Sequence, residues 1–428
     1  MEKQESVSDM RHSNQVGKIV VFGILICCFI YANCNHMFAT ENFLTEKTDA
    51  KRSNGTIVEL LQKQEGKEPS NETQVPSINA RSAALLDASN GRVLYSKNGT
   101  TQMAMASTTK IMTCIVVLEH MKNHDVVQIS ANAARQPDVQ LHVLEGEQFE
   151  VKDLLYALML ESCNDVAVAL AEHIGGSVEE FAQMMNQKAE ELGCRQTHFV
   201  TPNGLDAGEH YSTAEDLCRI GAYAIKNPEF LKITQAESYR FAEKKSGKQY
   251  SVTNKDAFLH MYQGAIGIKT GFTGNAGYCF VGAAKRGENC LVSAVLAAGW
   301  PPHKTYKWSD TKSIMDYGFQ NFQSMVLFRK KFSIKPIEVW KGTKLNVPVA
   351  TKQVKMTMLA DHTEQTAVLY EHPYTVAAPV SKGDVLGTVY YVVDEHVYRK
   401  EDAYSKETVG KYTYGFIAGQ LAKVWAFF

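Results

Sequence analysis

The spacing of hydrophobic positions predicts strands at both ends of the segment 78–325. Residues 82–86 and 92–95 flank the turn-forming sequence 88–91 and predict a β-hairpin. Three more short apolar runs after Gln263 predict further strands: 265–269, 277–284 and 290–297. Strands drawn from both ends of a segment, with helices between them, are typical of an α+β domain whose first and last strands meet in one sheet.

Helical spacing dominates the middle of this segment. Apolar residues recur at i, i+3, i+4 and i+7 from Ile111 to Leu118, which predicts a helix over 107–120. The same spacing predicts helices over 152–160 and 166–174, separated by a polar interruption that contains Ser162 and Asn164. The helices are therefore expected to form a cluster beside the sheet.

From Phe332 onward the pattern changes to short alternating strands without a long helix: 337–340, 344–349, 353–359, 367–370 and 385–392. This pattern predicts a small β-sandwich over 332–412. The tail 413–428 places its large apolar side chains on one face at helical spacing: Phe416, Ile417, Leu421, Val424, Trp425 and Phe428. It is predicted to be an amphipathic helix, and the sequence leaves open whether that helix lies on a membrane or packs on the sandwich.

The first 77 residues differ from the rest of the chain. Lys18 precedes the apolar run 19–32, which is shorter than the roughly 20 residues of a membrane span. Residues 1–39 are therefore predicted to be an export signal, either cleaved or retained as an anchor, which implies an extracytoplasmic location in the cell envelope. Residues 40–77 contain few large apolar side chains and are predicted to form a flexible linker.

The composition fits a two-domain globular protein of 428 residues, 45% of them hydrophobic and 21% charged. The formal net charge of −1 provides no positive field for a nucleic acid, so no such partner is expected. None of the 13 histidines forms an HExxH motif, and no metal or cofactor is expected. Six cysteines beyond the signal region favour buried thiols, with a bridge between Cys194 and Cys218 left open.

Three short motifs occur in a fixed order along the α+β segment: Ser107-Thr108-Thr109-Lys110, Ser162-Cys163-Asn164 and Lys269-Thr270-Gly271. Each motif is weak alone, because SxxK also occurs at Ser309 to Lys312 and SxN at Ser77 to Asn79. The order of the motifs and their helical or strand context distinguish the first set from these chance matches.

The chemistry of the first motif follows from its spacing. Side chains at i and i+3 of a helix lie about 5–6 Å apart at Cβ, so Lys110 can reach the Ser107 hydroxyl. An amine accepts the proton of a serine only if its pKa falls far below about 10.4. Burial and the second positive charge of Lys269 would have to favour the neutral amine by on the order of 4 kcal/mol. Ser162 and Asn164 would supply a hydroxyl for proton transfer and an amide for substrate, beyond a simple helix cap.

With these motifs the sequence resembles the penicillin-binding proteins and class A β-lactamases, and specifically the low-molecular-mass D-Ala-D-Ala carboxypeptidases. The resemblance covers 81–309, including 201–206 and 211–216, and extends to the C-terminal module at 378–384. It implies an α+β catalytic domain of antiparallel sheet and helical cluster, followed by the small β-sandwich. It also implies a hydrolase that acts on peptidoglycan stem peptides ending in D-Ala-D-Ala and is acylated by β-lactam antibiotics.

The same resemblance implies a role for each motif residue: Ser107 as nucleophile, Lys110 as general base, Ser162 as proton relay to the leaving group, Asn164, Lys269, Thr270 and Gly271 as substrate-binding residues, and the backbone N–H groups of Ser107 and Phe272 as oxyanion hole. Some relatives carry histidine where this chain has Phe272. No ExxLN sequence lies between the second and third motifs, which disfavours a β-lactamase. Endopeptidase activity on cross-links remains the alternative.

Overall fold

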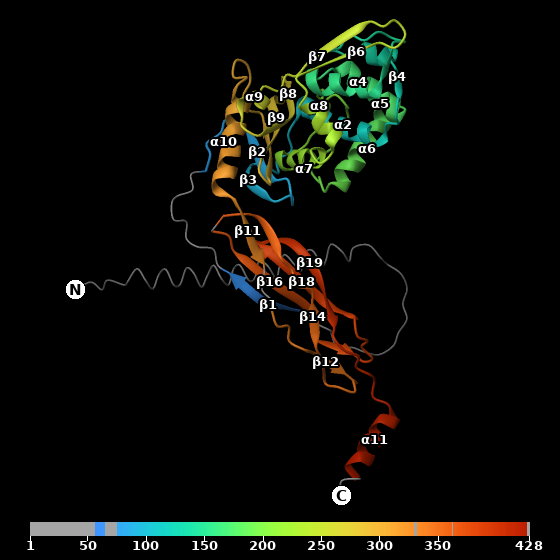
Figure 1. Ribbon diagram of the computed structural model, residues 1–428, viewed down its shortest axis with the longest axis vertical. Helices are drawn as coiled ribbons and strands as arrows, with labels where there is room; N and C mark the ends of the chain where they lie inside the picture. Colours follow the sequence, from blue (N-terminus) through green and yellow to red (C-terminus); the bar gives the residue numbers. More distant parts are fainter. Residues whose placement is uncertain (1–55, 65–74, 329–331, 362, 426–428) are drawn as a thin grey trace, which may run out of the picture. The chain divides into compact units, whose positions relative to one another are not determined.

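The computed structural model describes residues 56–64, 75–328, 332–361 and 363–425. These residues form two compact units (Figure 1). The α+β unit contains 75–325 and 358–361, and the β-rich unit contains the remaining described residues. The predicted export signal, 1–39, lies outside the described residues.

A five-stranded antiparallel sheet forms the centre of the α+β unit, with the strand order β3-β2-β10-β9-β8. The first and last strands meet, since Ala84 in β2 lies opposite Ala294 in β10, and this prediction is confirmed. The strands are β2 (Ser82–Asp87), β3 (Val93–Lys97), β8 (Ala265–Thr273), β9 (Gly277–Arg286) and β10 (Asn289–Leu296).

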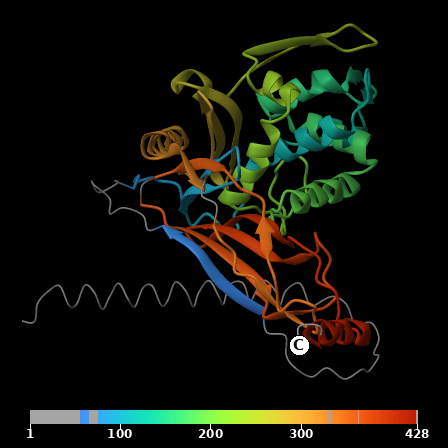
Figure 2. The same cartoon turned by 60° about the horizontal axis from the view of Figure 1, so that its bottom comes forward.

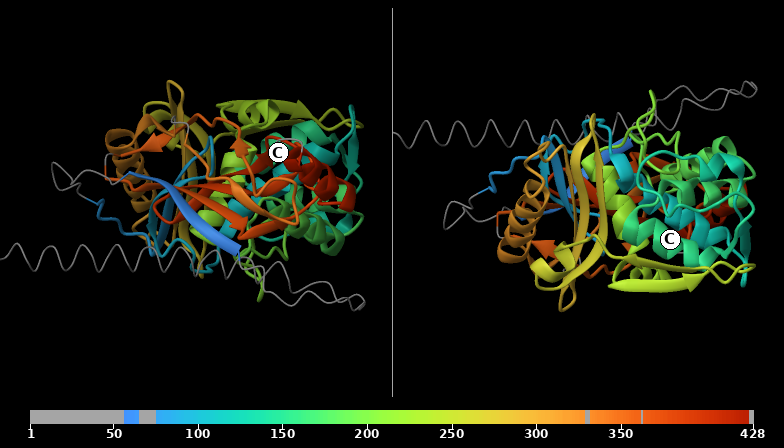
Figure 3. Two further views of the ribbon diagram at one scale, coloured as in Figure 1. Left: turned by 90° about the horizontal axis from the view of Figure 1, so that it is seen from below. Right: turned by 90° about the horizontal axis from the view of Figure 1, so that it is seen from above.

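Helices cover both faces of this sheet, which explains why β2 is buried along its whole length. Ala84 and Leu86 belong to one hydrophobic cluster with Leu217 of α7, whereas Leu85 belongs to another with Ile314 of α10. Figure 3 shows α10, in orange, on one side of the strands and the green helical cluster on the other. The central strands therefore read as continuous apolar runs rather than as an alternating pattern.

The helical cluster is built around α2, in which every residue from Lys110 to Val117 is buried. The other helices of the unit vary in length from 4 to 16 residues, and small two-stranded sheets lie among them. The elements are η1 (Ala106–Thr109, a 3-10 turn), α2 (Lys110–His120), α3 (Ala131–Ala134), α4 (Val151–Tyr156), η2 (Ala157–Glu161, a π turn), α5 (Asn164–Gly175), α6 (Val178–Glu191), α7 (Ala214–Ala224), α8 (Pro228–Thr234), α9 (Phe258–Met261), α10 (Tyr306–Asn321), β4 (Val126–Gln128), β5 (Gln148–Glu150), β6 (Ser238–Ala242) and β7 (Gln249–Thr253).

The β-rich unit contains a five-stranded sheet of order β1-β16-β18-β19-β14 and a three-stranded sheet of order β13-β12-β17 (Figure 2). The chain passes between the two units at β11 (Gln323–Phe328) and β15 (Met356–Ala360). The other strands are β1 (Thr56–Gln64), β12 (Ile337–Trp340), β13 (Asn346–Val347), β14 (Val349–Thr351), β16 (Thr366–Pro373), β17 (Thr375–Ala377), β18 (Val385–Val393) and β19 (His396–Ser405).

The predicted flexible linker over 40–77 is wrong for 56–64, which form β1. This strand, coloured blue in Figure 2, pairs antiparallel with β16, with Leu60 opposite Leu369. Val58 packs against the small cluster that contains Leu369 and Val392. The composition of 40–77 as a whole is polar, but the apolar and β-branched residues of β1 suffice for an edge strand once a partner about 300 residues away supplies the hydrogen bonds. The β-rich unit is therefore discontinuous in sequence.

The tail forms a helix, α11 (Tyr414–Trp425), as predicted, and residues 426–428 lie outside the described part of the chain. No helix within the described residues combines the length and apolar character needed to cross a membrane. The six cysteines beyond the predicted signal region are all free thiols, so the bridge between Cys194 and Cys218 that the sequence left open is not formed.

Candidate active site

The first motif lies where η1 runs into α2. Ser107 is in the 3-10 turn and Lys110 begins the α-helix, whereas the sequence predicted one helix from 107. The Lys110 Nζ lies 2.9 Å from the Ser107 Oγ, so the amine is within hydrogen-bonding distance of the hydroxyl. Because α2 is buried in the centre of the helical cluster, this geometry is held by the core of the unit.

The hydrogen-bond partners of Lys110 orient the lone pair of a neutral amine towards Ser107. Its side chain is fully buried, and Nζ donates to Asn164 Oδ1 at 2.7 Å and to the Asn203 carbonyl oxygen at 2.5 Å. Both of those oxygens can only accept, so they take the two N–H groups of a neutral amine. The lone pair then faces the Ser107 hydroxyl, which is the arrangement that proton removal requires.

Two physical causes hold the pKa of Lys110 well below its ordinary value. Burial, which removes water from the charged form, is the larger cause, and the positive charge of Lys269 is the second. Cys163 and Asp165 oppose the shift. Asp165 is itself held by backbone N–H groups, since its carboxylate accepts from Leu141 and from Val166. The site itself therefore favours the neutral form of the amine.

Ser162 occupies the break between η2 and α5. Its backbone is left-handed, with φ +68°, which is uncommon for a residue with a Cβ and is found where function or a tight turn requires it. Its Oγ is buried and has no hydrogen-bond partner within the described residues. A buried hydroxyl without a partner is costly, so this hydroxyl is available to a group that enters the site.

Asn164 holds Lys110 rather than projecting freely into the site. Its Nδ2 donates to the carbonyl oxygens of Pro137 (3.0 Å) and Asp138 (2.5 Å), while Oδ1 accepts from Lys110. Both amide hydrogens are thus engaged by the loop that contains 137–139. This arrangement makes Asn164 a positioning residue for the amine, and the predicted contact between its amide and a substrate stays a prediction.

The third motif lies on β8, the edge strand of the sheet, and packs against the turn that carries Ser107. A Cβ added at Gly271 would meet the Ser107 backbone nitrogen at 3.0 Å and the Met105 carbonyl oxygen at 3.1 Å. A side chain at this position would push the two backbones apart slightly, so glycine favours their close approach. This approach brings β8 beside the Ser107 N–H, which supports an oxyanion hole formed with the N–H of Phe272, although that role stays a prediction.

The side chains of the third motif differ in exposure. Lys269 is buried and its Nζ donates to the Thr270 carbonyl oxygen at 3.1 Å, whereas Thr270 is partly exposed. The Phe272 ring is 43% exposed and its centroid lies 4.5 Å from that of Tyr278. Phe272 therefore adds an exposed apolar surface beside the motif.

Sequence reasoning assigned no role to the loop 200–204, which supplies the third partner of Lys110. The loop is fastened to α2 a second time, because Thr113 Oγ1 donates to the Pro202 carbonyl oxygen at 2.6 Å. Gly204 has φ +84°, and a Cβ there would lie 2.1 Å from the Ala106 carbonyl oxygen. The Asn-Gly pair at 203–204 is a turn signal visible in the sequence, but its contact with the first motif is not.

Asp256 is a second residue that sequence reasoning missed. Its side chain is buried, Oδ1 accepts from the Phe258 backbone N–H at 3.0 Å, and Oδ2 has no hydrogen-bond partner within the described residues. Burial raises the pKa of Asp256 to about 7. Burial lowers the pKa of Lys269 to about 8, and the negative charge of Asp256 opposes that shift. The carboxylate therefore helps to keep Lys269 protonated.

Asp256→Asn is expected to move the alkaline limb of the pH–rate profile to lower pH. The amide keeps an oxygen for the Phe258 N–H but removes the charge that raises the pKa of Lys269, so Lys269 loses its proton below about pH 8. The measurement is the second-order rate constant of acylation by a penicillin between pH 6 and 10. Glu229→Gln, at an exposed carboxylate of α8, is the control, and an alkaline limb that stays in place in Asp256→Asn would contradict the assignment.

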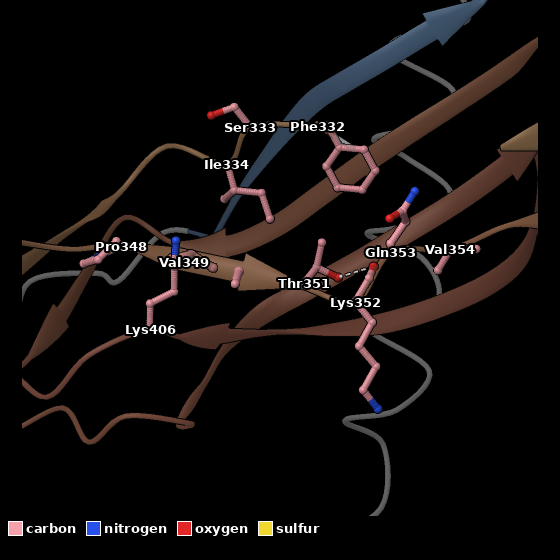
Figure 4. A pocket seen from close by; sticks show the side chains of 11 residues that line it. Phe332, Ser333, Ile334, Pro348, Val349, Thr351, Lys352, Gln353, Val354 and Lys406 are labelled. Atoms are coloured by element: carbon pink, nitrogen blue, oxygen red, sulfur yellow. Dashed lines mark hydrogen bonds between the residues drawn. The ribbon is translucent and has the colours of Figure 1, made fainter. Parts of the chain in front are cut away.

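A hollow of about 380 Å³ lies in the β-rich unit (Figure 4). It is lined by residues 332–334, 348–354 and Lys406, and by none of the motif residues. The site is identified by the convergence of the three motifs.

Comparison with known proteins matches both units. Residues 69–299 match the model of the peptidase S11 family, described as D-alanyl-D-alanine carboxypeptidase, and 322–411 match that of the penicillin-binding protein 5 C-terminal domain. The D-alanyl-D-alanine carboxypeptidase DacF of Bacillus subtilis is 31% identical over 357 residues, covering 82% of this chain and 90% of the relative. Two solved structures extend the match to three dimensions.

Penicillin-binding protein 5 of Haemophilus influenzae is similar with a TM-score of 0.62 and 30% identity, covering 79% of this chain and 99% of that structure. The DD-transpeptidase of Streptomyces K15 is similar with a TM-score of 0.55 and 34% identity, covering 58% of this chain and 99% of that structure. The first likeness includes the β-rich part of the chain, because its coverage exceeds that of the second by about a fifth of the sequence. The α+β architecture with a β-rich C-terminal domain, as predicted, is confirmed.

Proposed function

The chain belongs to the serine-type D-alanyl-D-alanine carboxypeptidases, and we propose that Ser107 carries the acyl-enzyme through which it removes the terminal D-alanine from peptidoglycan stem peptides. The observation that carries this assignment is the contact between Lys110 Nζ and Ser107 Oγ at 2.9 Å, with both other hydrogen bonds of the amine directed at carbonyl-type oxygens.

In the acylation step the Ser107 Oγ attacks the carbonyl carbon of the scissile bond and its proton passes to Lys110 Nζ. The new positive charge on the amine is held by Asn164 Oδ1 and the Asn203 carbonyl oxygen, which already accept from it. The carbonyl oxygen becomes negative and would be bound by the backbone N–H groups of Ser107 and Phe272. The bond that forms is the Ser107 ester.

The leaving D-alanine needs a proton on its amine when the C–N bond breaks. Ser162 supports a relay of that proton from Lys110, because its Oγ is buried and has no partner within the described residues. After the product leaves, a water molecule repeats the sequence on the ester, with Lys110 again taking the proton. A penicillin ring opened on Ser107 leaves its amine attached, which explains why such acylation would outlast that by the natural substrate.

Lys269 and Thr270 support recognition of the substrate's terminal carboxylate. Lys269 provides a buried positive charge, and Thr270 provides a partly exposed hydroxyl on the same strand. Because the pKa of Lys269 is about 8, binding of the carboxylate weakens as the pH rises through that value. In the acid direction, activity falls as Lys110 becomes protonated and loses its lone pair.

Two substrates separate the carboxypeptidase from the alternative endopeptidase, which uses the same chemistry. The protein is incubated with a pentapeptide that ends in D-Ala-D-Ala and, in parallel, with a cross-linked peptide dimer. We expect free D-alanine from the pentapeptide at a rate well above the cleavage rate of the dimer. Preferential cleavage of the dimer would contradict the carboxypeptidase assignment, while loss of both activities would contradict the assignment of the site.

We further propose that the protein works in the cell envelope and that its tail contacts the membrane surface. Large apolar side chains are exposed next to the base of α11: Trp340 is 58%, Leu345 73% and Tyr414 95% exposed. Trp340 and Leu345 lie on a turn that is hydrogen-bonded to the segment before α11, since Tyr412 N donates to the Lys341 carbonyl oxygen at 3.0 Å. Exposed aromatic rings beside lysines are typical of residues at a membrane interface.

The double variant Leu421→Glu, Trp425→Glu is expected to bind vesicles containing anionic lipid several-fold more weakly than the unchanged chain, because it places charges on the apolar face of the tail. Co-sedimentation of the full-length protein with the vesicles measures this difference. Both proteins keep the apolar run 19–32, so its contribution is the same in each. Equal binding would contradict the tail contact, and the rate of acylation by penicillin should not change.

A further inference from the structure

The buried histidine at position 210 is hydrogen-bonded to the turn that carries the nucleophile. His210 is 5% exposed, and its Nε2 lies 2.9 Å from Thr109 Oγ1. Thr109 Oγ1 in turn donates to the Ala106 carbonyl oxygen at 2.8 Å. On the other side of the ring, the Val200 backbone N–H donates to His210 Nδ1 at 3.0 Å. The imidazole therefore bridges the loop 200–204 and η1.

The Val200 amide fixes the direction of each hydrogen bond in the series that runs through His210 and Thr109 to Ala106. A backbone N–H can only donate, so Nδ1 must accept and the hydrogen of the neutral ring is on Nε2. Nε2–H then donates to Thr109 Oγ1, whose own hydrogen is left for the Ala106 carbonyl oxygen. Burial lowers the pKa of His210 to about 4, so the ring is neutral at the pH of catalysis.

The chain of hydrogen bonds ends at the one residue of η1 whose backbone is strained. Ala106, directly before Ser107, has φ +49°, a left-handed conformation that is unfavourable for a residue with a Cβ. Such a conformation persists only where surrounding contacts impose it. Gly204 also packs on this carbonyl group, because a Cβ at that position would lie 2.1 Å from the Ala106 oxygen and 2.9 Å from Thr109 Oγ1.

The other end of the chain fixes the loop that orients the general base. Val200 and Thr201 both direct their backbone N–H groups to His210 Nδ1, at 3.0 and 3.4 Å. Two residues later, the Asn203 carbonyl oxygen accepts from Lys110 Nζ. A displacement of this loop would remove one of the two acceptors that direct the lone pair of the amine towards Ser107.

We propose that His210 is a positioning residue for acylation: through Thr109 it holds Ala106, and with it the Ser107 backbone and hydroxyl, and through Val200 it holds the loop that orients Lys110. The ring does not touch the reacting atoms. This inference rests on the proposed roles of Ser107 and Lys110, and it adds that the two groups are aligned by a single buried imidazole.

A matched pair of variants at Thr109 tests the hydrogen bonds that link His210 to Ala106. Thr109→Val keeps the shape of the side chain but removes the hydroxyl, whereas Thr109→Ser keeps the hydroxyl. We expect Thr109→Val to lower the acylation rate constant at saturating penicillin on the order of tenfold to hundredfold, because small displacements of reacting groups have effects of that size. The dissociation constant of penicillin before acylation should change little, and Thr109→Ser should remain close to the unchanged protein.

His210→Gln is the second variant. The double variant His210→Gln, Thr109→Val measures whether the two side chains affect acylation independently. If the two side chains act through one chain of hydrogen bonds, the double variant should be no slower than the slower single variant. Each rate is measured per folded molecule, with the folded fraction taken from circular dichroism. Variants that lose thermal stability but acylate at the unchanged rate would overturn the proposal, because they would show a purely structural role.

A measurement on the unchanged protein makes the proposal testable even if the variants do not fold. The nitrogen NMR shifts of the His210 ring distinguish a hydrogen on Nε2 from one on Nδ1, and the chain requires Nε2–H near pH 7. A ring protonated on Nδ1 would overturn the proposal. If the assignment of Ser107 as the nucleophile were wrong, Ser107→Ala would still be labelled by penicillin. Thr109→Val, in contrast, is expected to be labelled slowly but completely.

Discussion

Ser107→Ala is expected to abolish covalent labelling by a fluorescent penicillin and to lower turnover of a D-Ala-D-Ala peptide on the order of 10⁶-fold, the loss seen when a serine hydrolase loses its nucleophile. The substitution removes only the oxygen that lies 2.9 Å from Lys110 Nζ, and it leaves the buried residues around the turn in place. Gel fluorescence measures the label, and released D-alanine measures turnover.

The chain offers its own control for this variant. Ser309 begins a second SxxK sequence, but it lies on α10, where its Oγ donates to the Tyr306 carbonyl oxygen at 3.0 Å. Ser309→Ala should therefore be labelled and should turn over substrate at the unchanged rate. Label that persists in Ser107→Ala, or that disappears in Ser309→Ala, would show that Ser107 is not the nucleophile.

Lys110→Met is expected to lower the acylation rate constant on the order of 10²- to 10⁴-fold, the usual contribution of a general base. Methionine has a similar length and suits a buried position, but it cannot take the proton of Ser107. It also leaves Asn164 Oδ1 and the Asn203 carbonyl oxygen without their donor, so some loss of stability should accompany the loss of rate. Stopped-flow measurement of penicillin acylation gives the rate.

Lys312→Met is the matched control, because Lys312 is the exposed lysine of the second SxxK sequence. It should leave both the acylation rate and the thermal stability unchanged. If Lys110→Met acylated at the rate of this control, another group would have to remove the serine proton.

The elements that could be predicted from the sequence are those whose signal is local. The hairpin at β2 and β3, the helix that continues from Lys110 and the strand that carries Lys269 each follow from spacing within one short window. The order of the three motifs along the sequence also predicts that these elements contribute to one site. The close approach of β8 to η1 gives the physical reason for the glycine of the third motif, since any Cβ at Gly271 would crowd the Ser107 nitrogen.

What could not be predicted depends on partners far away in the sequence. β1 gains its hydrogen bonds from β16, so nothing within its own short apolar run distinguishes it from a linker. The Asn203 contact with Lys110 uses a backbone carbonyl, which has no side-chain signature. His210 and Asp256 act through burial, and burial of a single polar residue cannot be inferred from its neighbours in the sequence.

Activation of Ser107 depends on a neutral Lys110 amine at the pH of catalysis. The most direct test is the pKa of its Nζ, measured from the Cε carbon shift of selectively labelled lysine by NMR in the unchanged protein, with the resonance assigned by its absence in Lys110→Met. We predict a titration well below the ordinary value of 10.5, as burial and the charge of Lys269 require. A Lys110 that titrates at or above 10.5 would rule out its role as general base, because such an amine keeps its proton and cannot activate Ser107.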